Sequence, residues 1–206
     1  VARADRVKAV ASRHTFNDAA DTAGVQVRLD RLGFPIEVDA AARTVRVPAA
    51  MTHARLADEL HALGWALPNL ASLPHISTAG AVATGTHGSG DAVPNLAASV
   101  AGVELVDSSG ALRRFARGGA DFDGVPVHLG ALGVITALTL DIVPTFEVAQ
   151  RVFLDLPYDR WVADFDAITA LGYSVSVFTT WRGPAADQLW VKSLAPSHEP
   201  AEAFGS

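Results

Sequence analysis

The feature that most limits the fold of this 206-residue chain is a series of short strand patterns arranged in hairpins, with few helices between them. Apolar and polar residues alternate in 36–47, with a turn near Asp39. Two further strand patterns, 100–106 and 112–115, flank the turn Asp107–Gly110. A doubly wound parallel sheet needs regular alternation of strands and helices, which this sequence lacks. We therefore expect an α+β fold.

Two helices are predicted. The first follows Thr52, a good N-cap residue, and ends at Gly64. His53 and His61 lie on this helix, and we expect both to be partly solvated. The second helix covers 159–171, well beyond the hairpins.

The chain is expected to divide into two domains. A long, nearly all-apolar strand, 134–143, ends at Pro144, and strand patterns resume beyond it. We therefore predict one domain over 1–145 and the beginning of a second over 146–206. Because the first residue is not methionine, we also expect the chain to be a piece of a longer protein.

Composition narrows the classes of function. Half of the residues are apolar, the mean hydropathy is +0.24, and the net charge is −6. This balance predicts a folded core and argues against a nucleic-acid or membrane partner. The absence of cysteine excludes disulfides, thiolate metal sites and cysteine nucleophiles. No run approaches about 18 apolar residues and the start lacks signal-peptide character, so we expect a cytoplasmic enzyme.

The glycine-rich run 80–90, Gly-Ala-Val-Ala-Thr-Gly-Thr-His-Gly-Ser-Gly, is the strongest local signal. Closely spaced glycines let backbone N–H groups approach a ligand, and the hydroxyls between them add donors. The run matches neither a Walker loop nor the dinucleotide-binding fingerprint. It fits a pyrophosphate-binding segment or a flexible surface loop, although the packed Ala81-Val82-Ala83 within it disfavours the second reading.

The histidines offer no metal site from their spacing. None of the seven forms an HxH, HxxxH or HExxH pattern, and no carboxylate lies between His75 and His87. His14 directly follows a strand pattern among polar neighbours. From these residues alone it is best interpreted as an ordinary hydrogen-bonded loop histidine. Motifs of serine hydrolases and paired acid/base carboxylates are also missing.

Several motifs in order resemble a known family. Ser-Arg-His-Thr-Phe-Asn at 12–17 is followed by Leu-Pro-His-Ile-Ser at 73–77 and by the run Thr-Gly-Thr-His-Gly-Ser-Gly at 84–90. This set is similar to the FAD-dependent alditol oxidases of the xylitol and sorbitol type, in the vanillyl-alcohol-oxidase superfamily. The similarity covers nearly the whole chain up to about Lys192, and it includes the segments 66–69, 103–106, 129–134 and 173–176.

The resemblance implies an FAD-binding domain of the PCMH type, followed by the beginning of a cap domain that shapes the substrate pocket. It implies that the flavin is attached covalently to His14. Ser72 is similar in position to a serine that faces the substrate, and it is the catalytic candidate. The residues implied to surround FAD, with the backbone near Ile135 meeting the adenine, are Ser12, Arg13, His14, Thr15, Phe16, Asn17, Ser72, Ser77, Gly80, Thr84, Gly85, Thr86, His87, Gly88 and Ile135.

The reaction implied by the resemblance is oxidation of a polyol's terminal hydroxyl to the aldose. Hydride passes to the flavin, and dioxygen is reduced to hydrogen peroxide. The partners expected are a small polyol and dioxygen, and the protein is expected to be a monomer. Two alternatives stay open, namely an aldonolactone-type oxidase or dehydrogenase and a catalytically incomplete flavin-binding fragment.

This chain departs from the family pattern at two places. Ala11 and Arg13 stand where the family often has glycine. An arginine there restricts φ, and its cation could also contact the phosphates. Chains of the family run to roughly double this length, as expected for two domain-sized units. The first strand–helix unit and most of the cap, with its Glu, Arg, Lys and His catalytic groups, are therefore expected outside this sequence.

Overall fold

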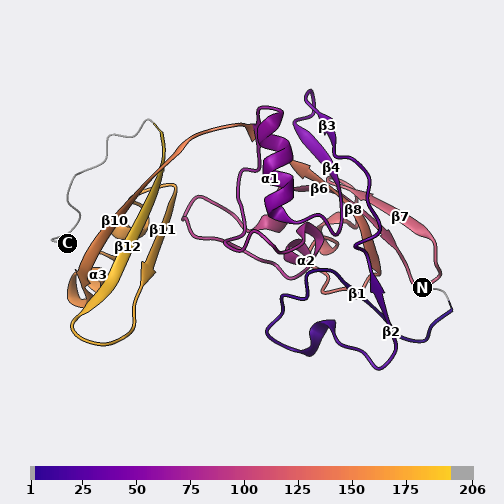
Figure 1. Ribbon diagram of the computed structural model, residues 1–206, viewed down its shortest axis with the longest axis horizontal. Helices are drawn as coiled ribbons and strands as arrows, with labels where there is room; N and C mark the ends of the chain where they lie inside the picture. The colour runs from indigo at the N-terminus through magenta and orange to yellow at the C-terminus, as the bar shows by residue number, and fades with distance from the viewer. Residues whose placement is uncertain (1–2, 196–206) are drawn as a thin grey trace. The chain divides into compact units, whose positions relative to one another are not determined.

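The computed structural model describes residues 3–195, which form two compact units (Figure 1). Unit 1 contains the chain up to His87 together with Asn95–Thr145, and unit 2 contains Gly88–Pro94 and the chain from Phe146. The end of the predicted second domain, 196–206, lies outside the described residues. No helix among the described residues is long and apolar enough to cross a membrane.

Unit 1 is built on a five-stranded antiparallel sheet with the order β3-β4-β8-β6-β7. Both predicted hairpins are present, and β8 lies between them. The strands are β3 (Glu37–Asp39), β4 (Thr44–Pro48), β6 (Val100–Val106), β7 (Leu112–Ala116) and β8 (Val134–Asp141). The mixed content of hairpins and few helices confirms the α+β prediction.

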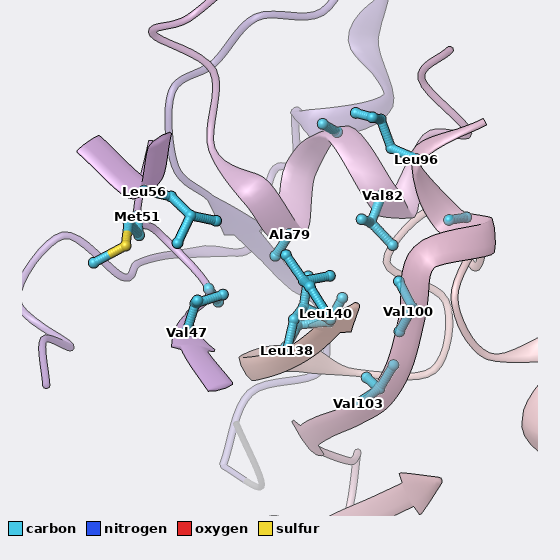
Figure 2. Packing of buried hydrophobic residues seen from close by; sticks show 14 of the residues in the cluster. Val47, Met51, Leu56, Ala79, Val82, Leu96, Val100, Val103, Leu138 and Leu140 are labelled. Atoms are coloured by element: carbon cyan, nitrogen blue, oxygen red, sulfur yellow. The ribbon is translucent and has the colours of Figure 1, made fainter. Parts of the chain in front are cut away.

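One face of this sheet carries the core of unit 1. Val47, Leu138 and Val103 are paired across three strands and are almost completely buried. Because side chains alternate across a strand, this register places every second apolar residue on the same face. Helices α1 (His53–Ala62) and α2 (Thr78–Ala83) cover that face, and Figure 2 shows Leu56, Ala79 and Val82 packed among the strand residues.

The smaller elements of unit 1 include a parallel strand pair, β1 (Val7–Val10) and β2 (Val25–Arg28). Parallel strands need a crossover, and here the crossover is the segment that contains His14. The remaining elements are η1 (Asp18–Ala20), β5 (Trp65–Ala66), η2 (Leu96–Ser99), η3 (Phe122–Gly124) and β9 (Val143–Pro144), of which β5 and β9 form an antiparallel pair.

Unit 2 has a three-stranded antiparallel sheet with the order β10-β12-β11. Its strands are β10 (Val148–Pro157), β11 (Ser174–Phe178) and β12 (Ala185–Leu194), and its helices are α3 (Tyr158–Ala163) and α4 (Phe165–Thr169). The single helix predicted over 159–171 is therefore divided, with Asp164 between the two parts. Leu156, Ile168 and Leu189 form the centre of a small core.

The short segment Gly88–Pro94 leaves unit 1 and belongs to unit 2. The hydroxyl of Ser89 lies 2.6 Å from that of Ser174, and the hydroxyl of Thr169 donates to the Asp91 carboxylate at 2.8 Å. The sequence pattern places a single division near residue 146 and gives no sign of this excursion. The glycine-rich run is thus shared between the two units.

Candidate functional site

Two of the motifs that lie far apart in the sequence meet in unit 1. The backbone N–H of Ser77 donates to the hydroxyl of Ser12 at 3.2 Å. The imidazole rings of His14 and His75 are in edge-to-face contact, with 5.6 Å between their centroids. We call Ser12–Asn17 the first wall and Ser77–Thr86 the second wall of the candidate site.

The first wall is an exposed loop with an unusual backbone. All of its side chains are exposed, and the ring of Phe16 is 97% accessible to solvent. Arg13 has a φ of 58°, in the left-handed region where glycine is favoured. Asn17 accepts hydrogen bonds from the backbone N–H of Ala19 at 2.9 Å and from the hydroxyl of Thr15 at 3.2 Å. The loop therefore offers an aromatic ring, an imidazole and several polar groups to a ligand.

The segment between the walls is held by the first turn of α1. The backbone N–H of His53 donates to the carbonyl of Ile76 at 3.1 Å, and that of Ala54 donates to the carbonyl of Pro74 at 2.8 Å. The first N–H groups of a helix have no partners inside the helix. These two bonds supply partners for two of them, and they also hold the Pro74–Ile76 segment against α1. His75, which lies between the two carbonyls, is presented on a fixed backbone.

The expectation that His53 is partly solvated is wrong. The residue is only 4% exposed, because it faces the core and lines a small space there with Leu67, Thr78 and Val82. Burial lowers the pKa of the His53 imidazole, which favours the neutral ring. His61, in the last turn of the same helix, is exposed as expected. Its Nδ1 lies 3.3 Å from the hydroxyl of Thr145.

The second wall is part of the core. Ser77 is 2% exposed and caps α2, with its hydroxyl accepting the N–H of Gly80 at 3.3 Å. A Cβ at Gly80 would lie 2.7 Å from that hydroxyl oxygen, so a larger residue would displace the cap. Gly85 follows the helix with a φ of 66°, and the N–H of Thr86 donates to the carbonyl of Ala81 at 3.0 Å. These bonds fix the backbone of the second wall, whose side chains are mostly small.

A third segment, 127–133, is attached to the second wall. The N–H of Leu129 donates to the carbonyl of Ala83 at 3.0 Å. His128 is 8% exposed, and its Nδ1 accepts the N–H of Leu132 at 3.4 Å. Burial lowers the pKa of the His128 imidazole, and the neutral ring can accept this bond at Nδ1. His128 therefore holds the turn that borders the site, a role that its sequence context did not reveal.

The other predicted site residues are distributed more widely. Ser72 is exposed and precedes the fixed Pro74–Ile76 segment. Ile135 is buried near the start of β8. His87 ends the part of the glycine-rich run that belongs to unit 1, whereas Gly88 belongs to unit 2. The roles given to these residues by the resemblance remain predictions.

Comparison with known proteins identifies the family. Residues 1–116 match the family described as FAD binding domain. The chain belongs to this family. It is 53% identical over 184 residues to an alditol oxidase from a Streptomyces strain, across 88% of this chain and 44% of that protein. It is 36% identical over 149 residues to an L-gulono-1,4-lactone dehydrogenase from Mycobacterium tuberculosis, across 72% of this chain and 35% of that protein. The chain thus spans less than half the length of these relatives.

Solved structures support the FAD binding domain fold. A cholesterol oxidase from Brevibacterium sterolicum superimposes with a TM-score of 0.79 at 15% identity, over 93% of this chain and 41% of that one. An alkyldihydroxyacetonephosphate synthase gives a TM-score of 0.77 at 15% identity, over 91% and 42% of the two chains. At these identities the likeness concerns the fold alone.

The chemistry of the two walls suits FAD, the ligand that gives the family its name. A pyrophosphate accepts hydrogen bonds, and the hydroxyl of Ser12, which accepts the N–H of Ser77, can donate its own proton to it beside the glycine-containing backbone of the second wall. A flat isoalloxazine needs an apolar or aromatic surface, and the Phe16 ring is left almost fully exposed. The residues present therefore fit this cofactor.

Proposed function

We propose that this chain is the FAD-binding part of an enzyme that oxidises the terminal hydroxyl of a xylitol- or sorbitol-type polyol to the aldose. Dioxygen is reduced to hydrogen peroxide, and the flavin is attached covalently to His14. The observation that carries the proposal is the 53% identity to an alditol oxidase over 88% of this chain.

The roles of this chain's residues are to hold the cofactor and one side of the substrate. FAD, when bound, accepts a hydride and passes the electrons to dioxygen. The backbone and hydroxyls of the two walls hold the pyrophosphate, and Phe16 and His14 border the ring system. Ser72 donates a hydrogen bond to a substrate hydroxyl and orients it for transfer.

The first test is an absorption spectrum of the purified protein before and after acid precipitation. Flavin absorbs at about 370 and 450 nm. Flavin that stays with the precipitated protein would support covalent attachment. The His14→Ala protein should still bind FAD non-covalently, and acid precipitation should then release all of this flavin into the supernatant. Flavin that still precipitates with the His14→Ala protein would refute attachment at this residue.

The second test distinguishes the substrate classes. Anaerobic addition of xylitol or sorbitol should bleach the flavin absorbance if the chain acts on polyols. Bleaching by L-gulono-1,4-lactone instead would favour the lactone alternative, which the 36% identity to a dehydrogenase of that substrate keeps open. A yellow protein that neither compound bleaches would be a flavin-binding portion that needs the rest of a longer chain to react.

A further inference from the structure

We propose that the segment Gly88–Pro94, which we call the strap, makes the order of strand β11 in unit 2 depend on FAD bound at the second wall. Binding of the cofactor in unit 1 therefore stabilises part of unit 2. The proposal rests on the proposed binding of FAD to the second wall and extends its effect along the chain. Its basis is that the strap is anchored at both ends in unit 1 and bonded to unit 2 between them.

The two ends of the strap are held by the second wall. The backbone N–H of Leu96 donates to the carbonyl of Thr86 at 3.0 Å, and the N–H of Thr86 donates to the carbonyl of Ala81 at 3.0 Å. Thr86 is therefore bonded on one side to α2 and on the other side to the point where the chain returns to unit 1. A loop with fixed ends has fewer conformations than one with free ends. Order at Thr86 thus lowers the loss of entropy when the strap docks.

The middle of the strap is bonded to two elements of unit 2. The hydroxyl of Ser89 lies 2.6 Å from that of Ser174 and 3.0 Å from that of Ser176, and both of these serines belong to β11. The hydroxyl of Thr169, the last residue of α4, donates to the carboxylate of Asp91 at 2.8 Å. The strap therefore connects the edge of the sheet of unit 2 with the end of a helix.

Gly90 brings the backbone of the strap against the backbone of unit 2. Its φ is 120°, and a Cβ added at this position would collide with the carbonyl oxygen of Tyr173, the residue before β11. Such a collision cannot be relieved by rotation of a side chain, because the carbonyl belongs to the main chain. The close approach therefore requires glycine, and it fixes where the strap lies at the start of the strand.

Strand β11 is the part of the sheet that depends most on such support. It is an edge strand, and its partner among the described residues is β12. All five of its residues are half-buried or exposed, whereas β10, the other edge, contains the fully buried Leu156. Segments with few buried contacts open most easily. Contacts with the strap should therefore provide a large share of the protection of β11 against opening.

The proposed cofactor site lies on the same stretch of backbone. His87 and Gly88, two of the residues predicted to surround FAD, are the last residue before the strap and its first residue. A ligand that orders this backbone favours the docked strap, because a segment that is already ordered loses less entropy when it docks. FAD and the contacts of the strap with β11 therefore stabilise one another.

The test measures hydrogen exchange of backbone amides by mass spectrometry. The 206-residue apoprotein, produced without riboflavin, is compared before and after saturation with FAD. Peptides of the second wall should exchange more slowly with FAD. Peptides of β11 should also be slowed, by at least about fivefold, the lower end of the range for coupled sites. Peptides of β10 are the internal reference and should change by less than about twofold.

Gly90→Ala is designed to displace the strap from β11. The added methyl group collides with the Tyr173 carbonyl, so FAD should slow the second wall as before but should change β11 by less than about twofold. Gly183→Ala is the matched control, because Gly183 also has a positive φ, at 93°, but its Cβ position faces open space. This variant introduces similar backbone strain in unit 2 without the collision, and it should behave as the wild type.

A second variant tests the strap without adding bulk. Ser89→Ala combined with Asp91→Ala removes the bonds to Ser174, Ser176 and Thr169. FAD should slow exchange in β11 less in this double variant than in the wild type, while the second wall should respond fully. If Gly90→Ala does not fold, the double variant alone decides.

The outcomes decide separately about the two proposals. FAD that slows exchange at the second wall of the wild type but leaves β11 unchanged would overturn the inference alone. Slowing of β11 that is as large in Gly90→Ala and in the double variant as in the wild type would also overturn it, as would an equal loss in Gly183→Ala. A wild-type protein that binds no FAD, with no change of exchange in any peptide, would refute the proposed function, and the inference with it.

Discussion

The two walls of the site are built in opposite ways. The first wall, Ser12–Asn17, is a loop whose side chains are all exposed and whose hydrogen bonds are mostly local. The second wall, Ser77–Thr86, contains α2, whose Thr78, Ala79 and Val82 are buried against the sheet. One wall therefore belongs to the core and the other to the surface.

This difference indicates how each wall serves a cofactor. Substitutions in the second wall should affect folding and binding together, because the buried side chains of α2 fix the backbone to which the binding role is given. Truncation of first-wall side chains should affect binding more than folding, because few of their contacts contribute to the folded state. A variant in one wall, compared with a variant in the other, tests this separation.

The largest contrast should come from Val82→Ala and Phe16→Ala. Val82 is 2% exposed, so its truncation should lower the free energy of unfolding by about 2 kcal/mol. Phe16 is 97% exposed, and Phe16→Ala should change that free energy by less than about 0.5 kcal/mol while weakening FAD binding roughly fivefold. Urea unfolding and a flavin titration measure the two effects. A Phe16→Ala protein as unstable as Val82→Ala would end the distinction.

The second contrast uses the left-handed residue in each wall. Gly85→Val places a β-branched residue at a φ of 66° and should cost about 1–2 kcal/mol as well as most FAD binding. Arg13→Gly removes the steric strain of a side chain at a φ of 58°, and it should stabilise the protein by up to about 1 kcal/mol. The same substitution removes the cation, and it should therefore weaken FAD binding. Thermal melts with and without FAD distinguish the two signs. Full FAD occupancy in Gly85→Val would contradict the role given to this backbone.

A smaller contrast is expected for the two capping side chains. Ser77→Ala removes the buried cap of α2 and should cost about 1 kcal/mol of stability. Asn17→Ala removes the cap of the short, exposed η1 and should cost only a few tenths of a kcal/mol. Urea unfolding of both proteins provides the comparison, and equal losses would show that the first wall is more tightly coupled to folding than its contacts indicate.

The smallest effect should be a pH dependence of stability from the buried histidines around the second wall. Burial lowers the pKa values of His53 and His128 in the folded protein, whereas the unfolded values are about 6.5. The unfolded chain therefore binds more protons as the pH falls below about 6.5, and stability decreases there. Between pH 7 and 6 we expect a loss below about 1 kcal/mol. His128→Gln should reduce this slope in urea unfolding measured at several pH values, and an unchanged slope would contradict the assignment.

The strands were predictable because their patterns are local. The alternation in 36–47 and the turn at Asp107–Gly110 each specify a hairpin without reference to the rest of the chain. Helix α2 was not predictable in the same way, because its run of small residues has no apolar stripe to mark a helix. Its helical state is decided by burial against the sheet, which no local pattern encodes.

The motif segments could be recognised in the sequence, whereas the contacts between them could not. The motif segments could be recognised from their order, but the contact between His14 and His75 depends on the crossover between β1 and β2 and on the docking of α1. The burial of His53 has the same origin. Spacing in the sequence contains no information about such contacts, because each is made by parts of the chain that lie far apart in the sequence.

The excursion of Gly88–Pro94 has a consequence for the modularity of this protein. Because this segment belongs to unit 2, the backbone passes between the units after His87, before Asn95 and again after Thr145. Unit 2 is therefore not a continuous insert that recombination could exchange as one block. Consider a hybrid that keeps residues 88–94 of this chain and takes the residues from 146 onward from a relative. Ser89 then needs a hydroxyl at position 174, and Asp91 needs one at position 169. The glycine-rich run and the second unit are thus expected to evolve as a linked pair.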